Sequence, residues 1–171
     1  MPRHSLFLLV ACLVAVLSGL GGCDKNAPAA NFGLGAGGGA GNFPPGSKQE
    51  FNGRIGDTVR YEVDSSELTA EGRSILNGQA VWLKQYSSYP ITVEGHADER
   101  GTREYNIALG ARRAETTKNF LIAQGISPAR IRTISYGKER PVAVCDDISC
   151  WSQNRRTVTV IDGGGAVASS Y

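Results

Sequence analysis

Apolar and polar positions follow two different periods between about residues 49 and 164. Val59, Tyr61 and Val63 are separated by single polar residues, which is the period-two pattern of a strand with one buried face. From residue 69 to residue 86, apolar side chains recur instead every three or four positions, the spacing of an amphipathic helix. The two periods predict strands at 59–63, 91–95, 131–136 and 157–161, helices at 69–86 and 104–124, and a short helical turn at Ser127 and Pro128.

Turn residues separate these elements. Pro90 prevents the first helix from continuing, and Gly125 stands where a helix C-terminus favours glycine. Because strand and helix signals alternate, the expected fold class is an α/β sandwich with a strand-helix-strand-helix-strand core and its helices packed on one sheet. This domain is expected to span residues 49–164, followed by a tail at 165–171.

The first two dozen residues have a different pattern. Arg3 and His4 precede a mostly apolar, uncharged run of 15 residues at 6–20. A membrane-spanning helix needs ~20 apolar residues, so a secretory signal peptide at 1–22 is favoured over a permanent transmembrane anchor.

A cysteine follows this run almost at once. Leu20-Gly21-Gly22-Cys23 resembles the lipobox of bacterial lipoproteins, which implies cleavage before Cys23 and lipid on its sulfur and amine. The alternative is an ordinary signal peptide whose cleavage leaves a cysteine near the new terminus. The outer membrane is the expected location of the lipid anchor. Asp24 resembles the inner-membrane retention signal of enteric bacteria, so retention in the inner membrane is left open.

The segment from Cys23 to Lys48 is expected to be a flexible linker. Its composition of Gly, Ala, Asn and Pro buries too little apolar surface to offset the entropy of ordering it. Such a chain has an r.m.s. reach of roughly 25 to 30 Å and a fully extended limit near ~85 Å. The composition suits a protein that bridges a membrane to a fixed structure beyond it.

Composition narrows the class of protein further. The 171 residues have room for one ordinary domain, and 41% hydrophobic against 20% charged residues excludes disorder over the whole length. Without Arg3, which lies in the predicted signal peptide, 17 basic residues face 16 acidic ones. A chain so close to neutral is not expected to bind nucleic acid.

Two cysteines remain after the leader and the lipobox. Cys145 and Cys150 enclose a four-residue loop, and in an exported protein they are expected to form a disulfide. A zinc site is the competing interpretation. It needs further ligands, and His96 is the single histidine after residue 4, so no metal and no cofactor are expected.

The candidate chemistry lies in the loop at 95–101 and in the helix after it. The loop carries Asp98, and Arg113 falls on an otherwise apolar stripe of the helix. A buried cation needs a partner or a ligand. Arg113 therefore either forms a salt bridge with Asp98 or Glu94, or shares a zwitterionic ligand with Asp98.

Several linked motifs at set intervals identify a family. Gly95 to Gly101, the run from Asn106 to Ala114 and Leu121 resemble the OmpA-like peptidoglycan-binding domain, and 135–141 and 154–156 extend the likeness. The resemblance covers about residues 51–162. Two helix positions depart from the usual pattern, because Gly110 replaces a common Ser and Thr117 replaces a common Val.

The resemblance implies a mixed sheet and a non-catalytic binding function. The implied ligand is the diaminopimelate of the peptidoglycan stem peptide, whose ammonium and carboxylate suit Asp98 and Arg113. Asp64 and Asn106 match residues that line the same pocket. For Arg155 and Arg156, the residues alone favour solvation or a carboxylate partner within the fold.

Together with the lipobox, the resemblance implies an outer-membrane tether on the periplasmic face that serves envelope integrity and cell division. Its implied partners are the Tol proteins, notably the periplasmic propeller TolB. Two alternatives remain: a peptidoglycan hydrolase, disfavoured because no nucleophile or metal site accompanies His96, Asp98 and Glu99, and a stator-type OmpA-like anchor, which requires a transmembrane helix.

Overall fold

The computed structural model describes residues 43–163. The predicted signal peptide, the predicted lipidation site Cys23, most of the linker and the tail at 165–171 lie outside these residues. The elements are α1 (Lys48–Glu50), the π-helix η1 (Phe51–Gly56), β1 (Thr58–Arg60), α2 (Ala70–Gln85), β2 (Ile91–His96), α3 (Arg103–Ala123), the 3-10 helix η2 (Pro128–Arg130), β3 (Ile131–Gly137), α4 (Ile148–Asn154) and β4 (Arg156–Ile161).

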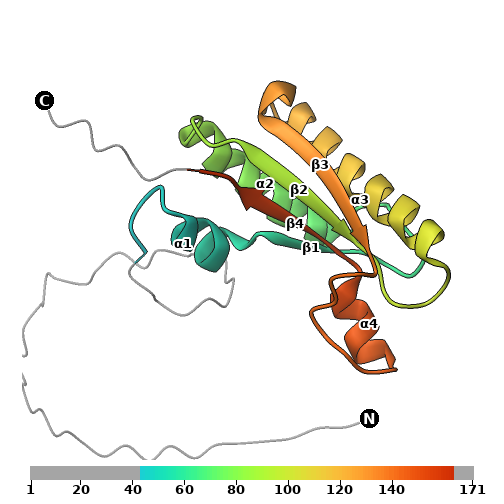
Figure 1. Ribbon diagram of the computed structural model, residues 1–171. Helices are drawn as coiled ribbons and strands as arrows, with labels where there is room; N and C mark the ends of the chain where they lie inside the picture. The colour runs from blue at the N-terminus through green and yellow to red at the C-terminus, as the bar shows by residue number, and fades with distance from the viewer. Residues whose placement is uncertain (1–42, 164–171) are drawn as a thin grey trace, which may run out of the picture. The chain divides into compact units, whose positions relative to one another are not determined.

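The strands form one mixed sheet in the order β1-β4-β2-β3. β4 is antiparallel to both β1 and β2, whereas β2 and β3 run parallel. Figure 1 shows the long helices α2 and α3 together on one face of this sheet. The expected α/β sandwich, with helices packed on one mixed sheet, is therefore confirmed.

The core lies between the sheet and these two helices. β2 contributes Ile91 and Val93, α2 contributes Leu76 and Leu83, and all four side chains are 0% exposed. Full burial of such a side chain stabilises the fold by roughly 1.5–3 kcal/mol. Among residues 43–163, no helix is long and apolar enough to cross a membrane.

Local sequence signals set both ends of α3. Its N-cap Thr102 accepts a hydrogen bond from the backbone N–H of Tyr105, 3.2 Å away. At the other end, Gly125 has a φ of +93°, and the N–H of Ile126 reaches back to the carbonyl of Leu121 at 3.0 Å. The predicted helix at 104–124 therefore agrees with the observed one to a single residue at each end.

α3 approaches β2 closely at one point. A Cβ on Gly95 would overlap the carbonyl oxygen of Gly110, and a Cβ on Gly110 would also overlap the Ser135 hydroxyl. Gly110, which departs from the family pattern, thus permits this contact. The other departure, Thr117, hydrogen-bonds the hydroxyls of Tyr61 at 2.8 Å and Thr157 at 3.0 Å.

The first strand is shorter than its alternation predicts. β1 ends at Arg60, and Val63 is 49% exposed instead of facing the core. Tyr61 N–H still bonds the carbonyl of Arg155 at 2.9 Å, but the chain then turns, with Ser65 N–H on the carbonyl of Glu62 at 3.3 Å. Tyr61 and Val63 continue the alternation of apolar and polar residues beyond the end of β1, so this pattern alone does not locate the turn.

The domain begins slightly before the expected position. The carboxylate of Glu50 accepts hydrogen bonds from Gly46 N–H at 2.8 Å and from the indole N–H of Trp82 at 2.9 Å. Ser47 caps the short α1 by accepting from Glu50 N–H. Gly46 and Ser47, which the sequence analysis assigns to the linker, are thus hydrogen-bonded within the domain.

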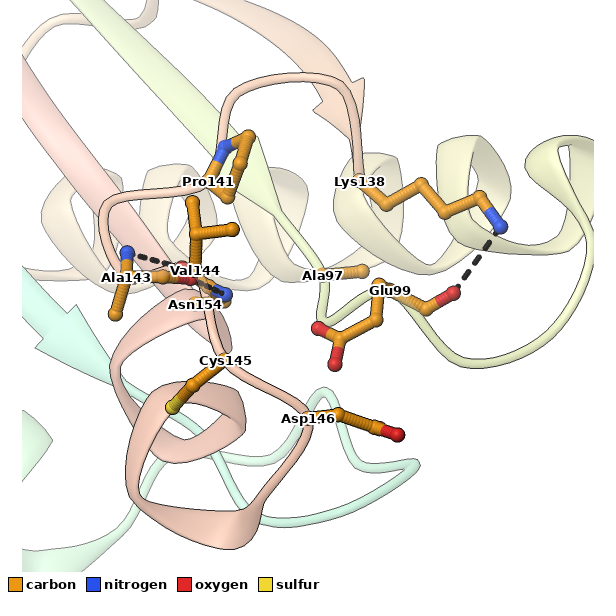
Figure 2. Close-up of a pocket in the computed structure, with 9 residues that line it drawn as sticks. All are labelled: Ala97, Glu99, Lys138, Pro141, Ala143, Val144, Cys145, Asp146 and Asn154. Carbon is orange, nitrogen blue, oxygen red and sulfur yellow. Dashed lines mark hydrogen bonds between the residues drawn. The ribbon is translucent and has the colours of Figure 1, made fainter.

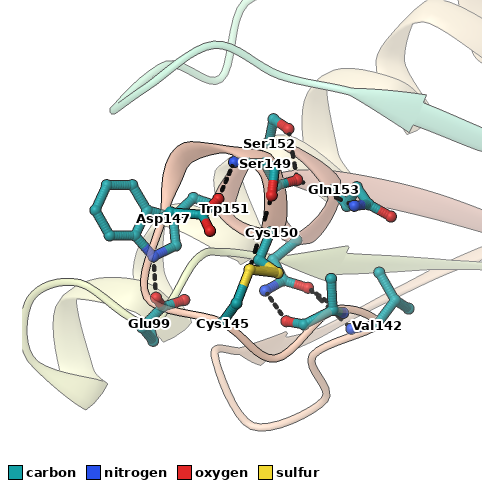
Figure 3. The surroundings of a disulfide bond; sticks show 11 residues. Glu99, Val142, Cys145, Asp147, Ser149, Cys150, Trp151, Ser152 and Gln153 are labelled. Atoms are coloured by element: carbon teal, nitrogen blue, oxygen red, sulfur yellow. Dashed lines mark hydrogen bonds between the residues drawn. A yellow bond between two sulfur atoms is a disulfide. The ribbon is translucent and has the colours of Figure 1, made fainter.

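The connection from β3 to β4 contains a helix that apolar periodicity did not predict. α4 starts after Asp147, whose carboxylate accepts from Ser149 N–H at 2.7 Å. Beside it, Cys145 and Cys150 form a disulfide with Cα atoms 5.6 Å apart, as Figure 3 shows. The disulfide expected from the sequence is confirmed, and it takes both cysteines away from the competing zinc site.

Removing this disulfide is expected to lower the stability of the domain by about 2 kcal/mol, because it closes only a short loop. The double variant Cys145→Ala/Cys150→Ala should show this loss as a lower midpoint of urea unfolding. A reductant should lower the midpoint of the wild type to that of the variant and leave the variant unchanged. Two free thiols in the native, unreduced protein would contradict the assignment.

Candidate ligand-binding site

One pocket gathers the four residues that the sequence analysis assigns to ligand binding. Asp64, Asp98, Asn106 and Arg113 all line a cavity of about 290 Å³. They come from three places: the turn after β1, the loop after β2 and the first half of α3. The other lining residues are Val63, Arg100, Gly101, Tyr105 and Leu109.

Asp98 is 7% exposed and its carboxylate is heavily bonded. Arg100 donates to it from Nη2 at 2.7 Å, from Nε at 3.2 Å and from its backbone N–H at 3.2 Å. Arg155 Nη1 donates to the same carboxylate at 3.3 Å. Burial opposes ionisation of Asp98, but the bonds from the two arginines outweigh it and hold the pKa of the carboxyl below its usual value. Asp98 is therefore an anion at neutral pH.

Arg113 is 0% exposed and bonds only backbone carbonyls. Nε donates to Ser65 at 2.7 Å, Nη1 to His96 at 2.8 Å and Nη2 to Glu62 at 3.1 Å. The salt bridge to Asp98 or Glu94 that the sequence left open is not formed.

The charge of Arg113 survives this burial. Removal from water lowers the pKa of the guanidinium to about 10, which still leaves it protonated at neutral pH. A guanidinium has five N–H donors, so three bonded carbonyls leave two N–H groups for another acceptor. Arg113 lines the pocket and can therefore offer a cation there.

Arg113 also shapes the turn that carries Asp64. The carbonyls of Glu62 and Ser65, on either side of Asp64, both accept from its guanidinium. Asp64 itself has a φ of +53°, a left-handed conformation that Asp tolerates better than most residues. Its carboxylate accepts a hydrogen bond from the hydroxyl of Tyr105. The turn is thus held from α3 at two points.

Asn106 fixes the loop after β2. It is 2% exposed, and its Nδ2 donates to the carbonyl of Arg100 at 2.7 Å. The loop that presents Asp98 and Arg100 is therefore tied to the first turn of α3.

Arg155 and Arg156 have structural partners. Besides its bond to Asp98, Arg155 donates from Nε to the carbonyl of Tyr61 at 3.1 Å. Arg156 donates to the carbonyls of Asn154 at 3.4 Å and Arg140 at 3.2 Å. Both side chains are buried, and Arg155 matches the expected role of holding a carboxylate within the fold.

His96 lies apart from the pocket although it is two residues from Asp98. It is 2% exposed, stacks on Tyr136 with ring centroids 5.5 Å apart, and neither ring nitrogen has a hydrogen-bond partner. Burial, reinforced by the positive charges of Arg156 and Arg140, lowers its pKa from 6.5 to about 4. Its ring is neutral and inaccessible, so it forms no acid-base cluster with Asp98 and Glu99.

A second pocket, of about 310 Å³, lies beside the disulfide loop (Figure 2). Its walls are mostly small or apolar side chains, including Ala97, Pro141 and Val144. Lys138 Nζ is bonded to the carbonyls of Glu99 at 3.1 Å and Gly101 at 2.8 Å. Because the ammonium of Lys138 is already hydrogen-bonded and most of the other walls are apolar, this pocket suits a charged ligand less well than the first pocket does.

Among the polar side chains of the pocket, sequence reasoning missed two, those of Arg100 and Tyr105. Arg100 is within the loop that was singled out, two residues after Asp98, and Tyr105 directly precedes Asn106. Their proximity in sequence was a usable signal. Their bonds to Asp98 and Asp64 depend on how the loop and the turn fold.

The fold and the pocket together define an OmpA-like domain, and the chain belongs to the OmpA family, whose model matches residues 60–155. It is 55% identical to the peptidoglycan-associated lipoprotein of Mesorhizobium japonicum over 92% of this chain and 94% of that protein. The crystal structure of the peptidoglycan-associated lipoprotein from Burkholderia pseudomallei is 34% identical, with a TM-score of 0.63 over 67% of this chain and 98% of that one. These relatives place the chain among the peptidoglycan-associated lipoproteins of the family.

The C-terminal domain of Helicobacter pylori MotB has the same fold. Its TM-score is 0.59 at 22% identity, covering 63% of this chain and 85% of that chain. At this identity the likeness concerns the fold alone.

Proposed function

We propose that the protein is a non-catalytic tether that joins the outer membrane to peptidoglycan by binding the diaminopimelate of the stem peptide. The observation that carries the proposal is one pocket in which a buried carboxylate and a buried guanidinium, Asp98 and Arg113, lie with Asp64 and Asn106. The names of the relatives, peptidoglycan-associated lipoproteins, support the same ligand class.

The charges of the pocket suit a ligand that carries an ammonium and a carboxylate on one carbon. Asp64 and Asp98 supply negative charge for the ammonium, and the two free N–H groups of Arg113 offer donors for the carboxylate. Three carbonyls hold the guanidinium of Arg113 in place. Its two remaining N–H groups therefore need no rearrangement when the ligand arrives.

The membrane end of the tether is assigned to Cys23, which lies outside the described residues. Two or more acyl chains on one residue give stable anchoring, at ~0.8 kcal/mol for each buried CH₂. The linker then spans the distance between the outer membrane and the cell wall. As a peptidoglycan-associated lipoprotein, the protein is proposed to act in the Tol-Pal system, with TolB as a partner, in envelope integrity and cell division.

The variant Asp98→Asn is expected to weaken binding to purified sacculi by roughly ten- to a hundredfold. Asparagine keeps the shape of the side chain but loses the negative charge that an ammonium requires. The measurement is cosedimentation of the mature protein with sacculi over a range of concentrations.

Glu115→Gln is the matched control, since it removes one carboxylate from an exposed position of the same domain. Circular dichroism should show that both variants are folded. A folded Asp98→Asn protein that pellets like the wild type would place the binding site elsewhere. Release of soluble muropeptides by the wild type would instead support a hydrolase.

A further inference from the structure

Arg100 occupies the carboxylate that the ligand needs. Its Nη2 and Nε form a bidentate pair with Asp98 at 2.7 and 3.2 Å. The side chain is 41% exposed, so it lies at the boundary between the pocket and solvent. Its guanidinium carbon is 4.3 Å from the centroid of the Trp151 ring, which is a cation-π contact.

Asp98 has no acceptor position to spare in this state. A carboxylate offers about four lone-pair sites, and Arg100 and Arg155 together donate four hydrogen bonds to it. A ligand ammonium therefore binds Asp98 only when one of these donors leaves.

The two arginines differ in how readily they can leave. The Arg155 side chain is 6% exposed and is also bonded to the carbonyl of Tyr61, so its release would strand a buried cation. The side chain of Arg100 is 41% exposed, so water can take over its hydrogen bonds. Arg100 is accordingly the donor that a ligand displaces.

Trp151 keeps a displaced Arg100 next to the pocket. The indole N–H of Trp151 donates to the carboxylate of Glu99, as Figure 3 shows, and the residue sits in α4 directly after the disulfide-bonded Cys150. The ring is therefore a fixed surface over which the guanidinium can shift without leaving the site. An arginine held in this way is available to a ligand carboxylate.

We propose that Arg100 is a specificity residue of the pocket: the zwitterionic carbon of the ligand inserts into the Asp98–Arg100 ion pair, with its ammonium on Asp98 and its carboxylate on Arg100. The inference rests on the proposed function and deepens it. In this arrangement Arg100 is a second guanidinium for the ligand carboxylate, beside that of Arg113. Its role is inferred from the ion pair that it forms with Asp98 in the absence of ligand.

The exchange of ion pairs makes the pocket selective. A zwitterion replaces the one ion pair it breaks with two new pairs. A ligand that carries the ammonium but lacks the carboxylate breaks the same pair and restores only one. Lysine differs from diaminopimelate in that one carboxylate, so a lysine stem peptide should bind more weakly.

The test compares two tripeptides, L-Ala-γ-D-Glu-meso-diaminopimelate and L-Ala-γ-D-Glu-L-Lys, by calorimetric titration of the mature protein. The wild type is expected to prefer the first peptide by about tenfold or more, the size of one partly exposed charge-assisted contact. Arg100→Gln should lose about that factor for the diaminopimelate peptide, with no loss for the lysine peptide. Arg132→Gln, which removes a guanidinium exposed by 78% outside the pocket, should keep the wild-type preference.

Three outcomes overturn the inference. If Arg100→Gln kept the preference for the diaminopimelate peptide over the lysine peptide, Arg113 alone would bind the carboxylate. Equal tightening of both peptides would make Arg100 a mere competitor for Asp98. Wild-type protein that binds neither peptide would refute the proposed function itself, which separates that failure from the first two.

Discussion

Replacing Arg113 with alanine is expected to lower the free energy of unfolding by about 3–5 kcal/mol and to abolish binding to sacculi. The substitution leaves three backbone carbonyls, those of Glu62, Ser65 and His96, without their donor and opens a cavity in the core. Because small domains are stable by only about 5–15 kcal/mol, this is a large share of the total. Urea unfolding of the wild type and the variant measures it.

The neighbouring Arg112→Ala serves as control. Arg112 is exposed and its guanidinium carbon lies 6.0 Å from the centroid of the Tyr105 ring, so its loss should change stability by no more than about 0.5 kcal/mol. Arg113→Lys tests the geometry, since an ammonium keeps the charge but cannot reach three carbonyls in the fork arrangement of a guanidinium. A lysine variant as stable as the wild type would show that charge alone, and not the three directed bonds, is what the fold requires.

Lowering the pH from about 6.5 to about 4 is expected to reduce the free energy of unfolding by on the order of 3 kcal/mol through His96 alone. Its pKa is about 4 in the folded state and near 6.5 when exposed to water. Between these values the unfolded chain binds a proton that the folded chain does not, so stability falls as the pH drops from about 6.5 to about 4. Above pH 6.5 this contribution is fully present. The charged groups near the ring are Glu94, Arg140 and Arg156.

The predicted titration can be measured directly. His96 is the only histidine after residue 4, so the mature protein should show a single imidazole signal by NMR. Its midpoint is expected near pH 4. In His96→Phe, which retains a ring against Tyr136, the difference in unfolding free energy between pH 7 and pH 4.5 should shrink. A midpoint above pH 6, or an unchanged pH dependence in the variant, would contradict the account.

Arg113 and His96 meet at the end of β2. The carbonyl of His96 accepts from Arg113, while its ring is buried on Tyr136. The residue therefore ends β2 in a fixed position, from which the loop continues to Asp98. We infer that stability and ligand recognition share Arg113, because it bonds both the end of β2 and the turn that carries Asp64.

Local pattern was sufficient for most of the regular elements, with α4 and the end of β1 as the exceptions. β2, α2, α3 and β4 lie within one or two residues of their predicted ranges, because apolar periodicity and capping residues such as Thr102 and Gly125 act over a few neighbouring positions. The same holds for the disulfide, whose two cysteines are five positions apart. The amino-acid sequence by itself thus determined the α/β class, the family and four of the residues that line the pocket.

Only the tertiary structure decided how those residues are bonded. Arg113 meets the carbonyl of Ser65 from 48 positions away, and Arg155 meets Asp98 from 57 positions away. The short β1, the turn at Asp64 and the fourth hydrogen bond to Asp98, the one from Arg155, depend on these distant partners. A hydrogen bond between remote segments leaves no periodic trace in either of them. The bonds of Arg113 and the Arg155–Asp98 pair therefore follow from the packing of α3 and β4 and not from any local pattern.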